Sequence, residues 1–235
     1  MRAIATPRVT RAAALLPLCA LFGTGVLATG ALPHPLVDEI TERCTPIVTA
    51  QKGMCEVELF YRCDDQGYAI VSAEAGELVG VEFSDLTGDL GDFVSLAGPG
   101  SVTVETTLDP LDLNLLRETG SETARTESTL DLGEEVAITL SLRPELSENT
   151  VTRNGMTFRT GSAGMDMETE ASIGGFSRVW DLLLPETENF VILGRSTMVT
   201  DRDTREFDTD VREILVPGNP GFQSHQGRFD CGEEL

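Results

Sequence analysis

The serine and histidine residues are the first candidates for catalytic chemistry. Nucleophilic hydrolysis requires a base beside a serine or a thiolate, and the chain has two histidines, His34 and His225. The segment 194–198 lacks the final glycine of the G-x-S-x-G nucleophile elbow, so a pairing of Ser196 with His225 is the serine-based arrangement that remains. No phosphate-binding glycine loop and no dinucleotide fingerprint follows an expected strand. We expect no catalytic residue of these types.

Carboxylates that could bind a metal ion recur at alternate positions in two short segments: Asp201, Asp203, Asp208 and Asp210. Calcium prefers such oxygen ligands. However, Arg212 stands where an EF-hand loop has its bidentate glutamate, and the central glycine is missing. Alternate residues of a half-buried strand also face water without any role in binding. We therefore expect no metal and no cofactor, and keep a hydrolase that uses carboxylates, with or without calcium, as the alternative function.

Apolar residues around the single tryptophan form the third candidate site. Trp180 lies in the segment 176–184, and a second apolar run, 190–193, follows a turn at Pro185. Continuous apolar strands are typical of burial on both faces. They indicate either ordinary core or the wall of a cavity for an apolar ligand. The residues we predict to bind such a ligand are Trp180, Leu183 and Phe190.

Four cysteines, Cys44, Cys55, Cys63 and Cys231, are expected to form disulfides, because their spacing contains no C-x-x-C metal knuckle. The segment from Cys55 to Cys63 alternates like a strand, which would hold the two residues roughly 26 Å apart. A disulfide needs Cα atoms within about 7 Å. Two pairings remain, and we favour Cys44–Cys55 with Cys63–Cys231 over the other.

The first thirty residues have the three parts of a secretory signal peptide. Three arginines are followed by an apolar run, and Ala28-Thr29-Gly30 offers the small residues that a signal peptidase recognises. We predict a signal peptide over 1–30, with Cys19 removed in it, and a single secreted domain over 31–235. An uncleaved membrane anchor and a lipid attached at Cys19 are the alternatives. The predicted location is periplasmic or secreted, with no stable membrane insertion after cleavage.

The remaining chain alternates between strand and turn signals. Ten or more short strands at intervals of eight to twelve residues predict an all-β fold. Asn154-Gly155 is typical of a type I′ hairpin turn. Helices are expected near 31–44 and after Asp109-Pro110, with Gly120 ending the second. We predict an antiparallel meander that forms a strongly curved sheet or incomplete barrel, with one or two short helices.

The charge of the chain excludes some partners. The formal net charge of −22 becomes −25 when the three leader arginines are removed. Such an acidic protein has no electrostatic attraction for nucleic acid or for an anionic membrane surface. Dispersed carboxylates also keep an exported protein soluble.

The chain resembles a group of uncharacterised exported proteins of alphaproteobacteria. The resemblance rests on the leader, on 154–158 (NGMTF), and on 217–222 (PGNPGF) with 229–232 (FDCG). It implies export and no particular activity. The half-barrel expected here is also similar in shape to the periplasmic lipoprotein carriers, none of whose motifs is present. We predict a non-enzymatic periplasmic protein that binds an apolar ligand or a protein partner.

Overall fold

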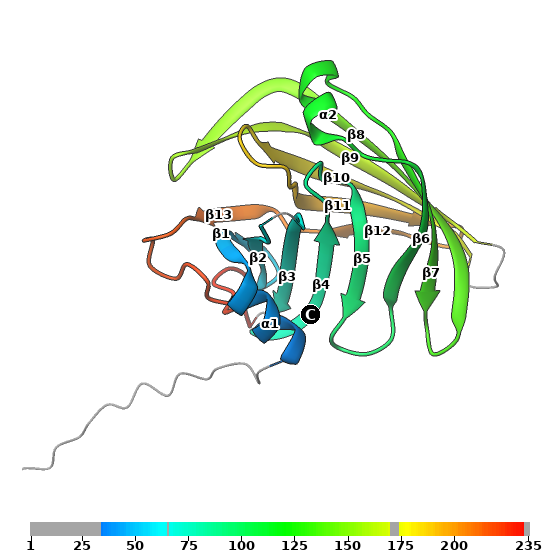
Figure 1. Ribbon diagram of the computed structural model, residues 1–235, viewed down its shortest axis with the longest axis horizontal. Coiled ribbons are helices and arrows are strands. Elements are labelled where there is room, and N and C mark those ends of the chain that lie inside the picture. The colour runs from blue at the N-terminus through cyan, green and yellow to red at the C-terminus, as the bar shows by residue number, and fades with distance from the viewer. Residues whose placement is uncertain (1–33, 65, 170–173, 233–235) are drawn as a thin grey trace, which may run out of the picture. The chain divides into compact units, whose positions relative to one another are not determined.

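A computed structural model describes residues 34–64, 66–169 and 174–232, so the predicted signal peptide lies outside the described residues. The described chain forms one antiparallel sheet of 13 strands with two short helices (Figure 1). The strands are β1 Thr45–Lys52, β2 Glu56–Arg62, β3 Tyr68–Glu74, β4 Glu77–Ser84, β5 Leu90–Ser95, β6 Ser101–Asp109, β7 Ala124–Asp131, β8 Glu135–Arg153, β9 Met156–Glu168, β10 Phe176–Pro185, β11 Ile192–Thr200, β12 Thr204–Phe207 and β13 Val211–Leu215. The helices are α1 Pro35–Arg43 and α2 Leu113–Thr119.

Strands that follow one another in the chain are neighbours from β1 to β12, and β13 then returns to pair with β1. The sheet curls on itself without closing, so that β12 and β13 are its two edges (Figure 1). This confirms the predicted all-β meander with a strongly curved, incompletely closed sheet. The curvature is what places strands from both halves of the chain around a common interior.

Side-chain hydrogen bonds connect the edge strand β13 and the residues just before it to other strands of the sheet. The tip of the β8–β9 hairpin reaches β13, where Arg153 Nη1 donates to the carbonyl of Val211 and Asn154 Nδ2 donates to that of Ile214. Thr209, just before β13, donates from Oγ1 to the carbonyl of Gly194 on β11 at 2.7 Å. Asn154 and Gly155 both have positive φ, as a type I′ turn requires, so the predicted hairpin is confirmed.

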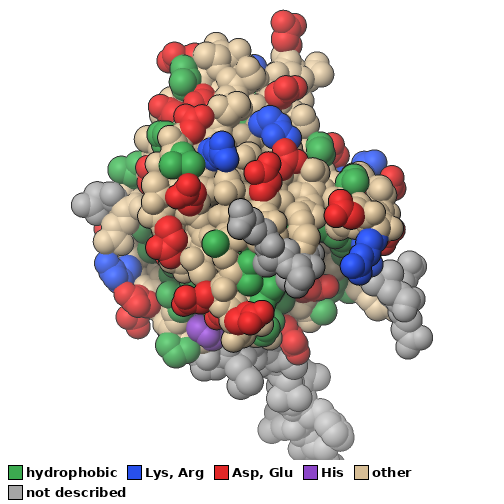
Figure 2. Space-filling view, turned by 90° about the vertical axis from the view of Figure 1, so that its right-hand side faces the viewer, with side chains coloured by type: hydrophobic (Ala, Val, Ile, Leu, Met, Phe, Trp, Pro, Cys, Tyr) green, Lys and Arg blue, Asp and Glu red, His purple; other side chains and the backbone are tan. Residues whose placement is uncertain are grey.

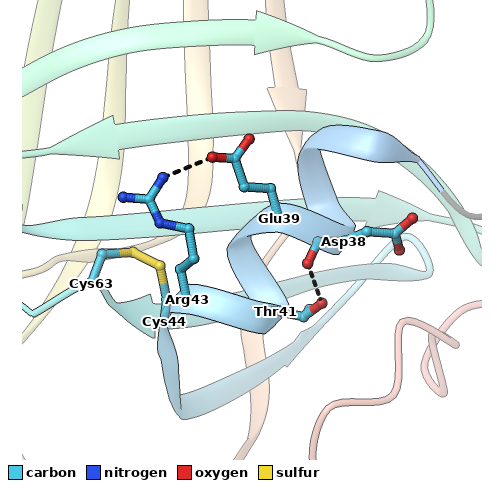
Figure 3. The surroundings of a disulfide bond; sticks show 6 residues. All are labelled: Asp38, Glu39, Thr41, Arg43, Cys44 and Cys63. Carbon is cyan, nitrogen blue, oxygen red and sulfur yellow. Dashed lines mark hydrogen bonds and ion pairs between the residues drawn. A yellow bond between two sulfur atoms is a disulfide. The ribbon is translucent and has the colours of Figure 1, made fainter.

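Helix α1 covers one face of the first strands. Pro35 stands at its first turn and His34 caps it by accepting from the backbone N–H of Leu36. Within the helix Arg43 donates to Glu39 at 2.7 Å, and Cys44 follows at its end, bonded to Cys63 (Figure 3). Ile40 is the buried residue of the helix and packs against a cluster formed by β2, β3 and β4.

Alternation along the strands divides the core between the two faces of the sheet. On β3, Ala69 and Val71 belong to the cluster beneath α1, whereas Tyr68 and Ile70 belong to another cluster that includes Phe60 and Phe190. Successive residues of a strand point to opposite faces, which explains this division. The second of these clusters lies next to the interior of the curved sheet, where the candidate site is found.

The four cysteines form two disulfides, as predicted, but the pairing that we favoured is wrong. The pairs are Cys44–Cys63 and Cys55–Cys231. Thr45 pairs with Arg62 across the β1–β2 hairpin, so the next residues outward, Cys44 and Cys63, face each other. Cys55 lies in the turn at the opposite end of that hairpin, out of reach of Cys44. The predicted separation of Cys55 from Cys63 agrees with the structure.

Several element boundaries differ from the predictions. Helix α2 begins at Leu113 with Asp112 as its cap, three residues after the predicted Asp109, and ends at Gly120 in the left-handed conformation as predicted. Strand β8, which precedes Asn154, runs for 19 residues and so is longer than the short strands expected. Strand β1 was not predicted.

Candidate ligand-binding site

Residues that lie opposite one another on neighbouring strands form one face of the sheet, and this face surrounds an apolar interior. In the first half, Glu82 on β4 lies opposite Phe93, Phe93 opposite Val102, and Val102 opposite Leu130. In the second half, Leu140 on β8 lies opposite Met167, and Met167 opposite Phe176. Directly opposed residues of antiparallel strands share a face. The two rows therefore form facing parts of one concave wall.

This wall encloses a cavity of about 340 Å³. Its volume falls within the range of about 300–1,000 Å³ that is usual for small-molecule sites. The residues that line it come from nine strands, β3 to β11, from α2 and from loops beside them: Ile70, Glu82, Ser84, Gly88, Leu90, Gly91, Phe93, Val102, Val104, Leu111, Leu113, Leu130, Ile138, Leu140, Leu142, Pro144, Ala163, Met165, Met167, Phe176, Trp180, Leu182, Phe190, Val191 and Leu193. Nearly all are apolar, so the interior is suited to an apolar molecule.

A carboxyl group interrupts this apolar lining. Glu82 and Ser84, two residues apart on β4, are the charged and the hydroxyl-bearing side chains among the residues that line the cavity. Within the described part of the chain, Glu82 makes no hydrogen bond and no ion pair. Burial, together with repulsion from Glu58, raises the pKa of Glu82 to about 7. The side chain is half-buried and lines the cavity.

A buried charge cluster lies beside Glu82. Lys52 on β1 donates to Glu56 and, at 2.9 Å, to Glu58, both on β2. Burial acts to lower the pKa of Lys52, but attraction by Glu58 and Glu56 outweighs it and raises the pKa. Burial raises the pKa of Glu58, and Lys52 offsets this effect only in part. The cluster holds two carboxylates for one ammonium group, so it leaves Glu82 without a cation of its own.

The segments around α2 cover part of the cavity. Leu111 and Leu113 line it, and Gly88 lies against Leu113 so closely that a Cβ atom on Gly88 would stand 2.3 Å from Leu113 Cδ1. Arg117 anchors the helix by donating to the carbonyls of Pro185 and Glu188 and to Asn189 Oδ1. A single arginine thus joins α2 to the loop between β10 and β11.

Two of the three predicted ligand residues line the cavity. Trp180 and Phe190 both contribute to the wall, whereas Leu183 does not. Leu183 lies opposite Thr160 and Ile192 and packs against the neighbouring core cluster, and the adjacent Leu182 lines the cavity instead. The guanidinium of Arg178 lies 4.9 Å from the centroid of Trp180, so the aromatic part of the wall is fixed by a cation–π contact.

Ser196 and three of the four candidate aspartates are engaged in structural contacts. Ser196 accepts two hydrogen bonds from Arg178. Asp203 pairs with Arg205, and Asp208 and Asp210 both pair with Arg212. Across residues 34–64, 66–169 and 174–232, no three His, Cys, Asp or Glu side chains are grouped so that they could hold a metal ion.

Sequence reasoning missed the polar part of the site. Alternation along β4 could have indicated that Glu82 and Ser84 share a face, but not that this face is the interior. Glu82 stands among acidic residues that are spread over the whole sequence and over the surface, as Figure 2 shows for one face. Only the curvature of the sheet distinguishes it from them.

Comparisons with known proteins found no matching family model, no matching curated protein and no matching solved structure. Within the described ranges, neither helix has the length and apolar character needed to cross a membrane. The site is therefore interpreted from its own geometry.

Proposed function

We propose that this protein binds an apolar or amphiphilic small molecule in the cavity of its curved sheet, as a non-enzymatic binding protein outside the cytoplasm. The observation that carries the proposal is the 340 Å³ cavity with its almost wholly apolar lining. The residues around an apolar cavity of this size lack some of the van der Waals contacts that they would make in a well-packed core. A ligand would restore those contacts, which supports binding as the reason for the cavity.

The edges of the sheet favour a small molecule over a protein that adds a strand. Edge strand β12 has four residues and carries Arg205 and Glu206, and charged short strands are poor templates for pairing. The other edge, β13, already receives Arg153 and Asn154 from the β8–β9 hairpin. The two disulfides support a location in an oxidising compartment, periplasmic or secreted.

Trp180 provides a direct test, because it is the only tryptophan and lines the cavity. A neutral naphthylamine dye is titrated into the protein while energy transfer from Trp180 to the dye is recorded. We expect saturable transfer, and displacement of the dye by long-chain alcohols. Native mass spectrometry of the protein purified without detergent checks for a ligand already bound.

Two matched substitutions locate the dye. Ala163 lines the cavity between Pro144 and Trp180, so Ala163→Leu fills part of it and should weaken dye binding about tenfold or more. Val179 is 52% exposed on the opposite face of the adjacent strand, so Val179→Leu should leave binding unchanged. Absence of saturable binding, or equal affinity in both variants, would overturn the proposed function.

A further inference from the structure

The polar side chains of the cavity bear on the class of ligand. Glu82 and Ser84 lie on the same face of β4, and the other lining side chains offer at most the indole N–H of Trp180 as a polar group. A ligand whose head reaches β4 would place its apolar part against Phe93, Val102 and the residues beyond them. The cavity thus has one polar end and one long apolar wall, as an amphiphile requires.

The charges around Glu82 determine which head group fits. Glu56 and Glu58 share Lys52, and Arg178 also attracts Glu56. These four groups are balanced, so an ionised Glu82 adds one uncompensated negative charge. A buried charge is stable only when it is paired or when it is neutralised. Within the described chain Glu82 has no cationic partner in hydrogen-bond contact, and its pKa is raised accordingly.

We infer that the cavity selects amphiphiles with a cationic amine head, which would form an ion pair with Glu82 and hydrogen-bond to Ser84. This inference rests on the proposed function and specifies its ligand. An ammonium group carries donors only, and so matches a carboxylate and a hydroxyl oxygen. An anionic head would meet repulsion from Glu82 and, behind it, from Glu58.

Three ligands with the same tail separate the head groups. Dodecylammonium, dodecanol and dodecanoate each displace the naphthylamine dye, at about pH 8, where Glu82 is largely ionised. We expect dodecylammonium to bind about tenfold more tightly than dodecanol, and dodecanoate to bind most weakly, because a charge-assisted hydrogen bond is stronger than a neutral one. Glu82→Gln should bring dodecylammonium and dodecanol to similar affinities.

Glu77→Gln is the matched control, since Glu77 is exposed at the start of the same strand and should leave the preference intact. A second measurement on the unsubstituted protein does not depend on the folding of any variant. Between about pH 8 and about pH 5.5 the preference for dodecylammonium should shrink as Glu82 takes up a proton. The charged groups that face Glu82 are Glu58 and Lys52, so the same titration in Glu82→Gln shows whether they contribute.

The outcomes distinguish the two proposals. If none of the three ligands displaces the dye, and native mass spectrometry finds none of them bound to the protein, the proposed function fails. If all three bind alike, or if dodecanoate binds best, the cavity binds amphiphiles and the inference about an amine head is overturned. A preference for dodecylammonium that survives in Glu82→Gln would equally overturn the role given to Glu82.

Discussion

Arg153 donates from Nη1 to the backbone carbonyl of Val211 at 3.0 Å, which joins the tip of the β8–β9 hairpin to the edge strand β13. The two residues are 58 positions apart in the chain. The contact ties the hairpin to β13, an edge at which no backbone ladder closes the sheet. It also keeps the wall of the cavity fixed, because β8 and β9 carry several of its lining residues.

Arg153→Ala should therefore weaken the fold. Loss of a partly buried hydrogen bond leaves the Val211 carbonyl without its donor, at a cost of about 1–3 kcal/mol in the free energy of unfolding. Urea unfolding measures the loss, and hydrogen exchange of β13 amides should accelerate. Arg195→Ala is the control: its ion pair with Asp181 is long and exposed, so its effect should stay below about 1 kcal/mol. Equal losses in both variants would contradict a bridging role.

The two disulfides should contribute unequally. In the chain-entropy model, stabilisation grows with the length of the closed loop. Cys44–Cys63 spans 19 residues and Cys55–Cys231 spans 176, which corresponds to about 3 and about 5 kcal/mol, respectively. Replacing each pair by serines and comparing denaturant unfolding tests this order. A larger loss from the shorter loop would show that local strain or packing, rather than loop entropy, dominates.

Glu82 should make stability depend on pH. Its pKa is raised from 4.5 to about 7 by burial and by Glu58, so the folded state holds the proton more tightly than the unfolded state does. Stability from this group is full below about pH 4.5, declines as the pH rises towards 7, and is lost above it, with a total of about 3 kcal/mol. Measured from pH 5 to about pH 8, Glu82→Gln should lose less stability than the unsubstituted protein. Parallel curves would mean that Glu82 titrates normally.

Arg117 should control the cover of the cavity. The guanidinium of Arg117 links α2 to residues 185–189. Removing it leaves the carbonyl groups of Pro185 and Glu188 without this hydrogen-bond donor. We expect Arg117→Ala to cost about 1–3 kcal/mol and to speed exchange of α2 amides. Dye release should also become faster. Glu118→Ala, on the exposed side of the same helix, serves as the comparison and should change neither rate.

The sequence predicted local features well and non-local ones poorly. Asn154-Gly155 and Gly120 were identified because their turn and cap conformations depend on residues next to them. Leu183 was assigned to the ligand site because a continuous apolar run does not reveal which of its residues face inward. In the structure Leu182, and not Leu183, lines the cavity.

The same limit explains the cysteine pairing and the polar part of the cavity. Strand spacing could exclude Cys55–Cys63, but the choice between the remaining pairings depended on β1, whose pairing with β2 was not anticipated. Glu82 differs from the other acidic residues only through the burial that distant strands impose on it. Patterns along one strand carry no information about such neighbours.

The pairing of β13 with β1 has a consequence for the order of synthesis. Residues 211–215 complete the sheet beside residues 49–52, so β1 lacks its second neighbour until a segment about 160 residues further along the chain has been made. Until then β1 is an open edge, able to pair with another emerging chain. A protein truncated before Val211 should therefore aggregate during its production, whereas a loss confined to residues 233–235 leaves every described strand in place.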